Sequence, residues 1–294
     1  IEGQLIIESY LNNLSLLPSL DNVKTIFKID SNNKYLISVL KLIKLNKNIE
    51  FIIDDHNYFN NKYLGKIVLS TTTINLARLG LKYNLKELNS FYQELSDVME
   101  LTKNQLLQRY ELQANKYNEN FKYLFKNNLL IDAEKLEDNQ KIRKVLRHGI
   151  LRIGFVGLLE CVKSILEETK ESSSKQIYDL SLDILMFMNN KIKDFQNDNK
   201  LDFELEETNN YHIKKELKAL DKSIYGTKII NKKEIYEQLN TIYKGLSLKE
   251  ILKITNLVND KIIIPKTDIT QQKIIDLYNN MIKENIKYGL IKIE

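Results

Sequence analysis

Apolar residues recur every three or four positions over much of the chain, which is the spacing of helices with one buried face. The pattern is longest over 85–113 and 175–195, and these two stretches predict long amphipathic helices. Polar side chains at 231 and 234, and at 247 and 250, fit helix N-terminal caps. Further stretches with helical spacing predict shorter helices at 4–14, 34–45, 158–170, 232–242, 247–257 and 270–286.

Short runs of β-branched and aromatic residues lie between the helical segments and predict strands. They are found at 50–53, 66–73, 150–153, 201–205, 261–264 and 288–293. Strands that alternate with helices favour a helix-rich α/β fold. The only compositional linker, 168–174, is too short to separate domains, so we expect one domain over 1–294.

Composition and charge limit the class of protein. The 294 residues carry a net charge of +5, without a basic block that interleaves with aromatics, so no nucleic-acid surface is expected. No apolar run reaches the roughly 18 residues that span a bilayer, and the start lacks a secretory pattern. A single cysteine excludes an internal disulfide. A cytoplasmic protein is expected, and the missing initiating methionine suggests a segment of a longer chain.

The segment from His148 to Cys161 holds the only cysteine and three of the nine glycines. Glycines at 149, 154 and 157 allow tight turns or close approach of the backbone to another group. A thiol directly after such a segment is a candidate reactive group. The alternative is that the cysteine simply packs in the core, as most free cysteines do.

Two motifs carry a resemblance to a known family. The segment HGILRIGFVGLLECVKSI, which begins at His148, resembles HGTLSIGFIGLAECLKAL of the anaerobic, glycyl-radical ribonucleoside-triphosphate reductases. Upstream, TTINLARLG over 72–80 resembles the family's VTINLPRLG, with Ala77 in place of proline. The similarity is good over about 60–205, and 206–294 has diverged strongly.

The resemblance implies an incomplete or shrunken version of a ten-stranded α/β barrel, with a reactive cysteine on a loop that reaches into it. In the family, a radical on this cysteine starts the reduction of ribonucleoside triphosphates to deoxyribonucleotides. Cys161 stands at the thiyl position of the motif, and Glu160, Gly154 and Gly157 are expected to shape the site. A buried thiol suits this chemistry, because hydrogen-atom transfer needs close contact and the exclusion of water.

Other family features do not appear in this sequence. The radical glycine, the cysteine-rich zinc module and the second cysteine have no counterpart, so we expect no cofactor in this chain and read Gly289 as a strand residue. The family's substrate loop aligns with 204–216, where only Thr208 is retained. Its glutamates Glu204, Glu206 and Glu207 would repel phosphate. The three histidines lack the spacing of metal ligands.

Two hypotheses follow. In the first, the chain is a reductase homologue that cannot turn over alone and needs a reductase subunit or a radical donor in trans, with a ribonucleoside triphosphate as ligand. In the second, it is a catalytically inactive paralogue that acts as a protein-binding or regulatory module. The oligomeric state cannot be read from the sequence.

Overall fold

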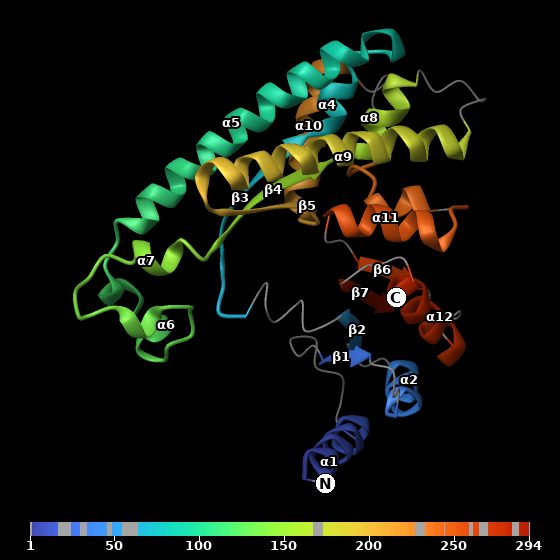
Figure 1. Cartoon of the computed structure of the whole chain (residues 1–294). Coiled ribbons are helices and arrows are strands. Elements are labelled where there is room, and N and C mark those ends of the chain that lie inside the picture. The colour runs from blue at the N-terminus through green and yellow to red at the C-terminus, as the bar shows by residue number, and fades with distance from the viewer. Residues whose placement is uncertain are drawn as a thin grey trace. The chain divides into compact units, whose positions relative to one another are not determined.

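The computed structural model describes the chain in two compact units, one formed by 63–246 and the other by 1–62 together with 247–294 (Figure 1). The described residues are 2–16, 25–29, 34–45, 49–54, 64–166, 173–226, 233–243, 245–258, 261–264, 270–283 and 288–293. Each unit has its own sheet. The single domain that the sequence predicts over 1–294 stays a prediction.

The larger unit is built on a parallel sheet of three strands in the order β3-β4-β5. The strands are Val68–Asn75, Ile150–Val156 and Asp202–Glu207. β4, the central strand, is buried at six of its seven positions because neighbours cover it on both edges and both faces. Since the three strands are parallel, their carboxyl ends meet at one edge of the sheet, where the candidate site lies.

Two long helices run along this sheet (Figure 1). Helix α5 is Leu88–Ala114, and its buried residues fall on one stripe at spacings of three and four. Helix α9 is Ser174–Asn199. It begins at a capping box in which Ser173 and Gln176 satisfy each other's backbone N–H groups. The shorter helices of the unit are α4 (Leu76–Gly80), α6 (Lys122–Lys126), α7 (Arg143–Leu146), α8 (Leu158–Ile165) and α10 (Tyr211–Tyr225).

The smaller unit has a mixed sheet in the order β1-β2-β7-β6. One of its two central strands, β7, pairs antiparallel with β2 and parallel with β6. The core includes Phe51, Leu252, Leu277 and Ile291. Its elements are α1 (Glu2–Leu16), β1 (Thr25–Ile29), α2 (Leu36–Lys44), β2 (Ile49–Asp54), α11 (Leu248–Val258), β6 (Lys261–Ile264), α12 (Gln271–Lys283) and β7 (Tyr288–Ile293).

The predicted fold class, a helix-rich α/β protein, is confirmed, and the sheet of the larger unit is parallel. Two local predictions are wrong. The helix predicted at 232–242 is absent over 233–238, and only a 3-10 helix forms, at Leu239–Tyr243. The stretch 204–216, aligned with a substrate loop, instead contains the end of β5 and the first turns of α10. No described helix is long and apolar enough to cross a membrane.

Candidate active site

Cys161 lies in the first turns of helix α8, directly after the carboxyl end of β4. Gly157 makes the turn between them, with a φ of +72° that an L side chain rarely adopts. The Cys161 N–H donates to the Gly157 carbonyl oxygen at 2.9 Å. The expected loop around the cysteine is therefore only this one-residue turn, and the thiol is held by a helix.

The Cys161 side chain is completely buried and rests against Gly80, the last residue of α4. A Cβ added at Gly80 would lie 2.6 Å from the Cys161 Cα and 2.9 Å from its Sγ. Only glycine allows the two helices to approach this closely. Gly80, the last residue of the motif TTINLARLG, thus contacts the cysteine of the other motif.

Burial raises the pKa of the Cys161 thiol, and the nearby Glu160 acts in the same direction. A hydrogen bond with the Gly80 backbone acts against this rise. The thiol therefore stays protonated at neutral pH and is a poor nucleophile. Hydrogen-atom transfer, however, uses the protonated S–H form, and here the burial of the side chain keeps water away from it.

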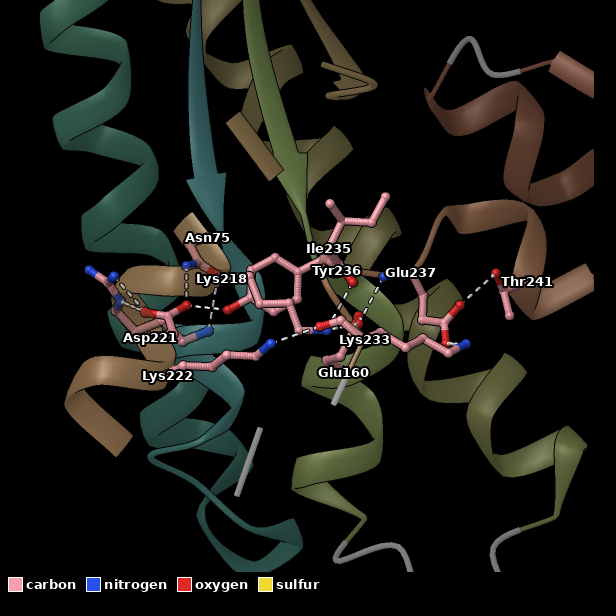
Figure 2. A network of polar contacts seen from close by, with 11 residues as sticks. Asn75, Glu160, Lys218, Asp221, Lys222, Lys233, Ile235, Tyr236, Glu237 and Thr241 are labelled. Atoms are coloured by element: carbon pink, nitrogen blue, oxygen red, sulfur yellow. Dashed lines mark hydrogen bonds and ion pairs between the residues drawn. The ribbon is translucent and has the colours of Figure 1, made fainter. Parts of the chain in front are cut away.

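Glu160, the neighbour of the cysteine, points its carboxylate toward the segment 235–237 (Figure 2). Its Oε1 accepts a hydrogen bond from the Glu237 N–H at 2.8 Å and lies 3.8 Å from Nζ of Lys218. Its Oε2 is buried and has no hydrogen-bond partner among the described residues. Burial raises the pKa of Glu160, and the Glu237 N–H and Lys218 oppose this rise.

A buried carboxylate, Asp221 of α10, ties α10 to the start of α4 (Figure 2). Its Oδ2 accepts from Asn75 Nδ2 at 2.5 Å and from the Tyr236 hydroxyl. Its Oδ1 accepts from Arg78 Nε at 2.6 Å. Asn75 also caps α4 through the Arg78 N–H. Asp221 therefore fixes the helix whose last residue contacts Cys161.

Two lysines of α10 are buried against carboxylates or carbonyls. Lys214 pairs with Glu207 at 2.8 Å, and both side chains are at most 5% exposed. Nζ of Lys218 donates to the Ile235 carbonyl oxygen at 2.9 Å and lies 5.0 Å from the centre of the Tyr236 ring. Burial lowers the pKa of Lys218. Each of these cations therefore has one carboxylate partner, in the pairs Lys214–Glu207, Lys218–Glu160 and Arg78–Asp221.

The other predicted site residues lie at the same edge of the sheet. Gly154 sits in β4 between Thr73 and Glu206, and a Cβ there would be 2.3 Å from the Thr208 Oγ1. Thr208 and Thr73 share a hydrogen bond between their hydroxyls at 2.9 Å. The structure thus brings Gly154, Gly157, Glu160, Cys161 and Thr208 together at the carboxyl ends of β3, β4 and β5.

The glutamates that were expected to face phosphate are engaged elsewhere. Glu204 and Glu206 both form ion pairs with Arg152 of β4, and Glu207 binds Lys214. The Leu239 N–H also donates to Glu207 Oε1 at 3.1 Å. Glu204 and Glu206 therefore link β5 to β4, and Glu207 links β5 to α10. They do not form a loop that would repel phosphate.

With this geometry in place, the sequence match decides the family. Residues 43–260 match the family described as anaerobic ribonucleoside-triphosphate reductase. The chain belongs to this family. The expectation drawn from the two motifs is confirmed. No curated protein sequence matches the chain.

Solved structures of anaerobic ribonucleotide reductases share the fold at low sequence identity. A structure from Thermotoga maritima in complex with dATP and CTP has a TM-score of 0.68 and 14% identity, covering 96% of this chain and 50% of its own. Another anaerobic ribonucleotide reductase has a TM-score of 0.65 and 13% identity, covering 92% of this chain and 44% of its own. A third, from T. maritima with MES in the active site, has a TM-score of 0.65 and 14% identity, covering 97% of this chain and 50% of its own. The chain spans about half the length of these proteins.

Among the residues that the structure describes, no cluster of three or more His, Cys, Asp or Glu side chains could hold a metal ion. His148 instead pairs with Asp132 at 2.9 Å, and the ring of His212 packs edge-on against Tyr211. His56 lies outside the described residues. Gly289 pairs with Ile53 inside the sheet of the smaller unit, as expected for a strand residue.

The functional residues that sequence reasoning missed belong to α10 and the segment after it. Lys214, Lys218 and Asp221 are spaced by four and three positions, which puts them on one face of a helix. That spacing is a signal of one polar helix face, but it does not tell whether the face points inward, because charged faces usually point to solvent. Tyr236 is marked only by the resemblance: Glu234 and Tyr236 form the Glu-x-Tyr that 231–243 keeps of the family's segment after the substrate loop.

Proposed function

We propose that this chain is the cysteine-bearing part of an anaerobic ribonucleoside-triphosphate reductase and that it needs a radical donor in trans. Cys161 is the residue that exchanges a hydrogen atom with the substrate. The observation that carries the proposal is the seat of this thiol, fully buried against Gly80 at the carboxyl ends of parallel strands. Ligands of open α/β sheets bind at that end.

Cys161 takes part in two successive hydrogen-atom transfers. An oxidising radical on the donor takes the hydrogen atom of the S–H bond and leaves the unpaired electron on sulfur. The sulfur then takes a hydrogen atom from a ribose carbon, so the C–H bond breaks and the S–H bond forms again. Its burial protects the sulfur from water and from competing thiols.

A second candidate function, an inactive module, is favoured by one specific observation. The cations around the candidate site, the buried Lys214 and Lys218 and the partly exposed Arg78, are already matched by carboxylates, in the pairs Lys214–Glu207, Lys218–Glu160 and Arg78–Asp221. A triphosphate that enters here must displace a carboxylate or recruit cations from the surface. Because separating a buried ion pair is costly, this arrangement favours a scaffold that no longer binds nucleotide.

Thermal unfolding of the full chain with each ribonucleoside triphosphate separates the two functions. A ligand at 100 times its Kd adds about 2.7 kcal/mol, which raises the Tm by several degrees. We expect a shift that is selective among the bases and that persists in C161A, since the thiol is needed for reaction and not for binding. The absence of a shift with every triphosphate would support the inactive module.

Activity is tested with the nucleotide that gives the shift and with a dithiol as the two-electron reductant. The radical donor is the radical-bearing reductase of a relative whose own thiyl cysteine has been replaced by alanine, so that the donor forms no product itself. C161A is expected to abolish deoxyribonucleotide formation completely. T208V, which keeps the side chain's shape but removes the hydroxyl, is expected to reduce the rate only partly, because Thr208 contacts Gly154 and Thr73 and not the sulfur. Product formation by C161A would show that the thiol assignment is wrong.

A further inference from the structure

A cavity of about 360 Å³ lies at the opposite end of the large unit's sheet from Cys161. Ile67, which lines it, directly precedes β3, and Leu146, which also lines it, ends α7 shortly before β4. The cavity is therefore at the amino ends of the strands. It shares no lining residue with the candidate active site. Its lining consists of Ile67, Gln113, Phe121, Leu124, Phe125, Leu130, Ile142 and Leu146.

Half of the residues that line this cavity belong to the buried core. Phe125, Leu130, Ile142 and Leu146 are each at most 8% exposed. Phe121, at 40% exposure, is the lining residue with an open face. None of the lining residues carries a charge. A charged ligand would lose its hydration here without gaining an ion pair, so a neutral ligand is favoured.

The lining has a single polar side chain, Gln113 of α5. Its Nε2 donates to the carbonyl oxygen of Leu69 at 3.0 Å, which orients the amide. No hydrogen bond to its Oε1 is formed by any of the residues that the structure describes. Pockets for small molecules combine apolar walls with a few fixed polar groups that orient the ligand. Gln113 offers one such group, a fixed acceptor.

Polar ties hold the surrounding loops in shape, so the cavity exists before any ligand enters. Asn118 binds both the Glu137 carbonyl oxygen, at 2.8 Å, and the Gln140 N–H, at 3.2 Å. The Ile131 N–H donates to the Gly65 carbonyl oxygen at 2.9 Å. A preformed site loses little entropy when it binds, which favours affinity.

We propose that this cavity binds a small uncharged molecule with a flat bicyclic apolar body and one hydrogen-bond donor, which it gives to Gln113 Oε1. An apolar cavity of about 150 Å³ holds benzene. A volume of about 360 Å³ therefore accommodates a larger, two-ring body. The site is separate from the reductase reaction, and its ligand need not be a nucleotide.

Indole is the probe, because it has two fused rings and one N–H donor. N-methylindole keeps the rings and lacks the donor. Titration of the full chain by calorimetry is expected to show saturable binding of indole, and binding of N-methylindole weaker by about tenfold, the effect of one hydrogen bond. Equal affinities would overturn the role of Gln113, and no saturable binding of indole would overturn the site.

Two matched variants locate the binding. L146F adds a ring inside the cavity and should abolish indole binding, whereas L112F adds the same ring at a residue 70% exposed on α5 and should leave it unchanged. NMR contacts from indole to the methyl groups of Leu130 and Ile142 in the unaltered chain give a test that does not depend on how L146F folds. Contacts only to methyl groups elsewhere would contradict the proposal.

Discussion

At the scale of single residues, the site depends on one close contact. Gly80 and Cys161 come from the two motifs that carry the family resemblance, 81 positions apart in the chain, and meet without a side chain between them. The presence of both motifs could be read from the sequence, but their contact could not. It depends on how α4 and α8 pack after β3 and β4, which is a non-local property.

Replacing Gly80 with alanine is expected to destabilise the chain by about 1–3 kcal/mol, the usual effect of overpacking a core. The new Cβ would stand 2.6 Å from Cys161 Cα, so α4 and α8 must move apart. Urea unfolding measures the loss, and the rate of alkylation of Cys161 should rise. The control is G3A, where nothing lies within 4 Å and the change should be neutral or slightly stabilising. Equal effects of the two changes would contradict the packing argument.

The buried carboxyl of Glu160 makes stability depend on pH. Its pKa is raised in the folded chain by burial, above the ordinary value of 4.5. The stabilising effect of the protonated form is therefore fully present below pH 4.5 and is lost as the pH rises through the raised pKa. The stability of E160Q relative to the unaltered chain should rise between pH 4 and pH 7 in urea unfolding. A fall over that range would mean that attraction to Lys218 outweighs burial.

At the scale of elements, the sequence predicts most helices and strands to within a few residues. Helix 85–113 is found at Leu88–Ala114, and strand 66–73 at Val68–Asn75. The sequence does not predict the short elements β1, α4, α6 and α7, and its wrong predictions lie at the end of β5 and after it. There α10 turns lysines and an aspartate inward. The segment 233–238 forms no helix, and the Glu237 N–H in it donates to Glu160 instead. Apolar periodicity cannot report a helix that is held by buried ion pairs, because partners such as Glu160 and Arg78 are distant in sequence.

The link between α10 and α4 predicts a large effect at Asp221. D221A removes the acceptor of Asn75, Arg78 and Tyr236 at once. We expect a loss of about 3 kcal/mol, the lower end of the range for a broken buried ion pair, because Arg78 is 32% exposed. Hydrogen exchange should show α4 opening more often.

The control is D179A on α9, which removes a surface pair with Lys175 whose side chains are 52% and 70% exposed. Such a pair contributes less than about 0.5 kcal/mol. If D221A proved as mild as D179A, the network around Tyr236 would not be what holds α10, and α10 would have to be kept in place by its apolar contacts alone.

At the scale of the whole molecule, the two units differ in how the chain builds them. The larger unit is continuous from 63 to 246, whereas the smaller one needs both ends of the chain. One of its two central strands, β7, is the last element of the sequence and lies between β2 and β6. The sequence predicts these strands individually, but not that strands from opposite ends pair, since pairing order leaves no local signal.

This topology predicts that a chain ending at 246 loses one sheet and keeps the other. Without β7, the pairing of β2 at Phe51 with Ile291 is gone, and the core loses Leu252 and Leu277. A sheet reduced to β1 and β2 buries too little to be stable alone. The larger unit keeps all three strands and its own core, so Cys161 should stay as slow to alkylate as in the full chain. Amide exchange resolved by residue checks both halves: protection lost over 25–54 and kept over 150–156 is expected, and loss of protection in both would mean that the larger unit depends on the smaller one for its stability.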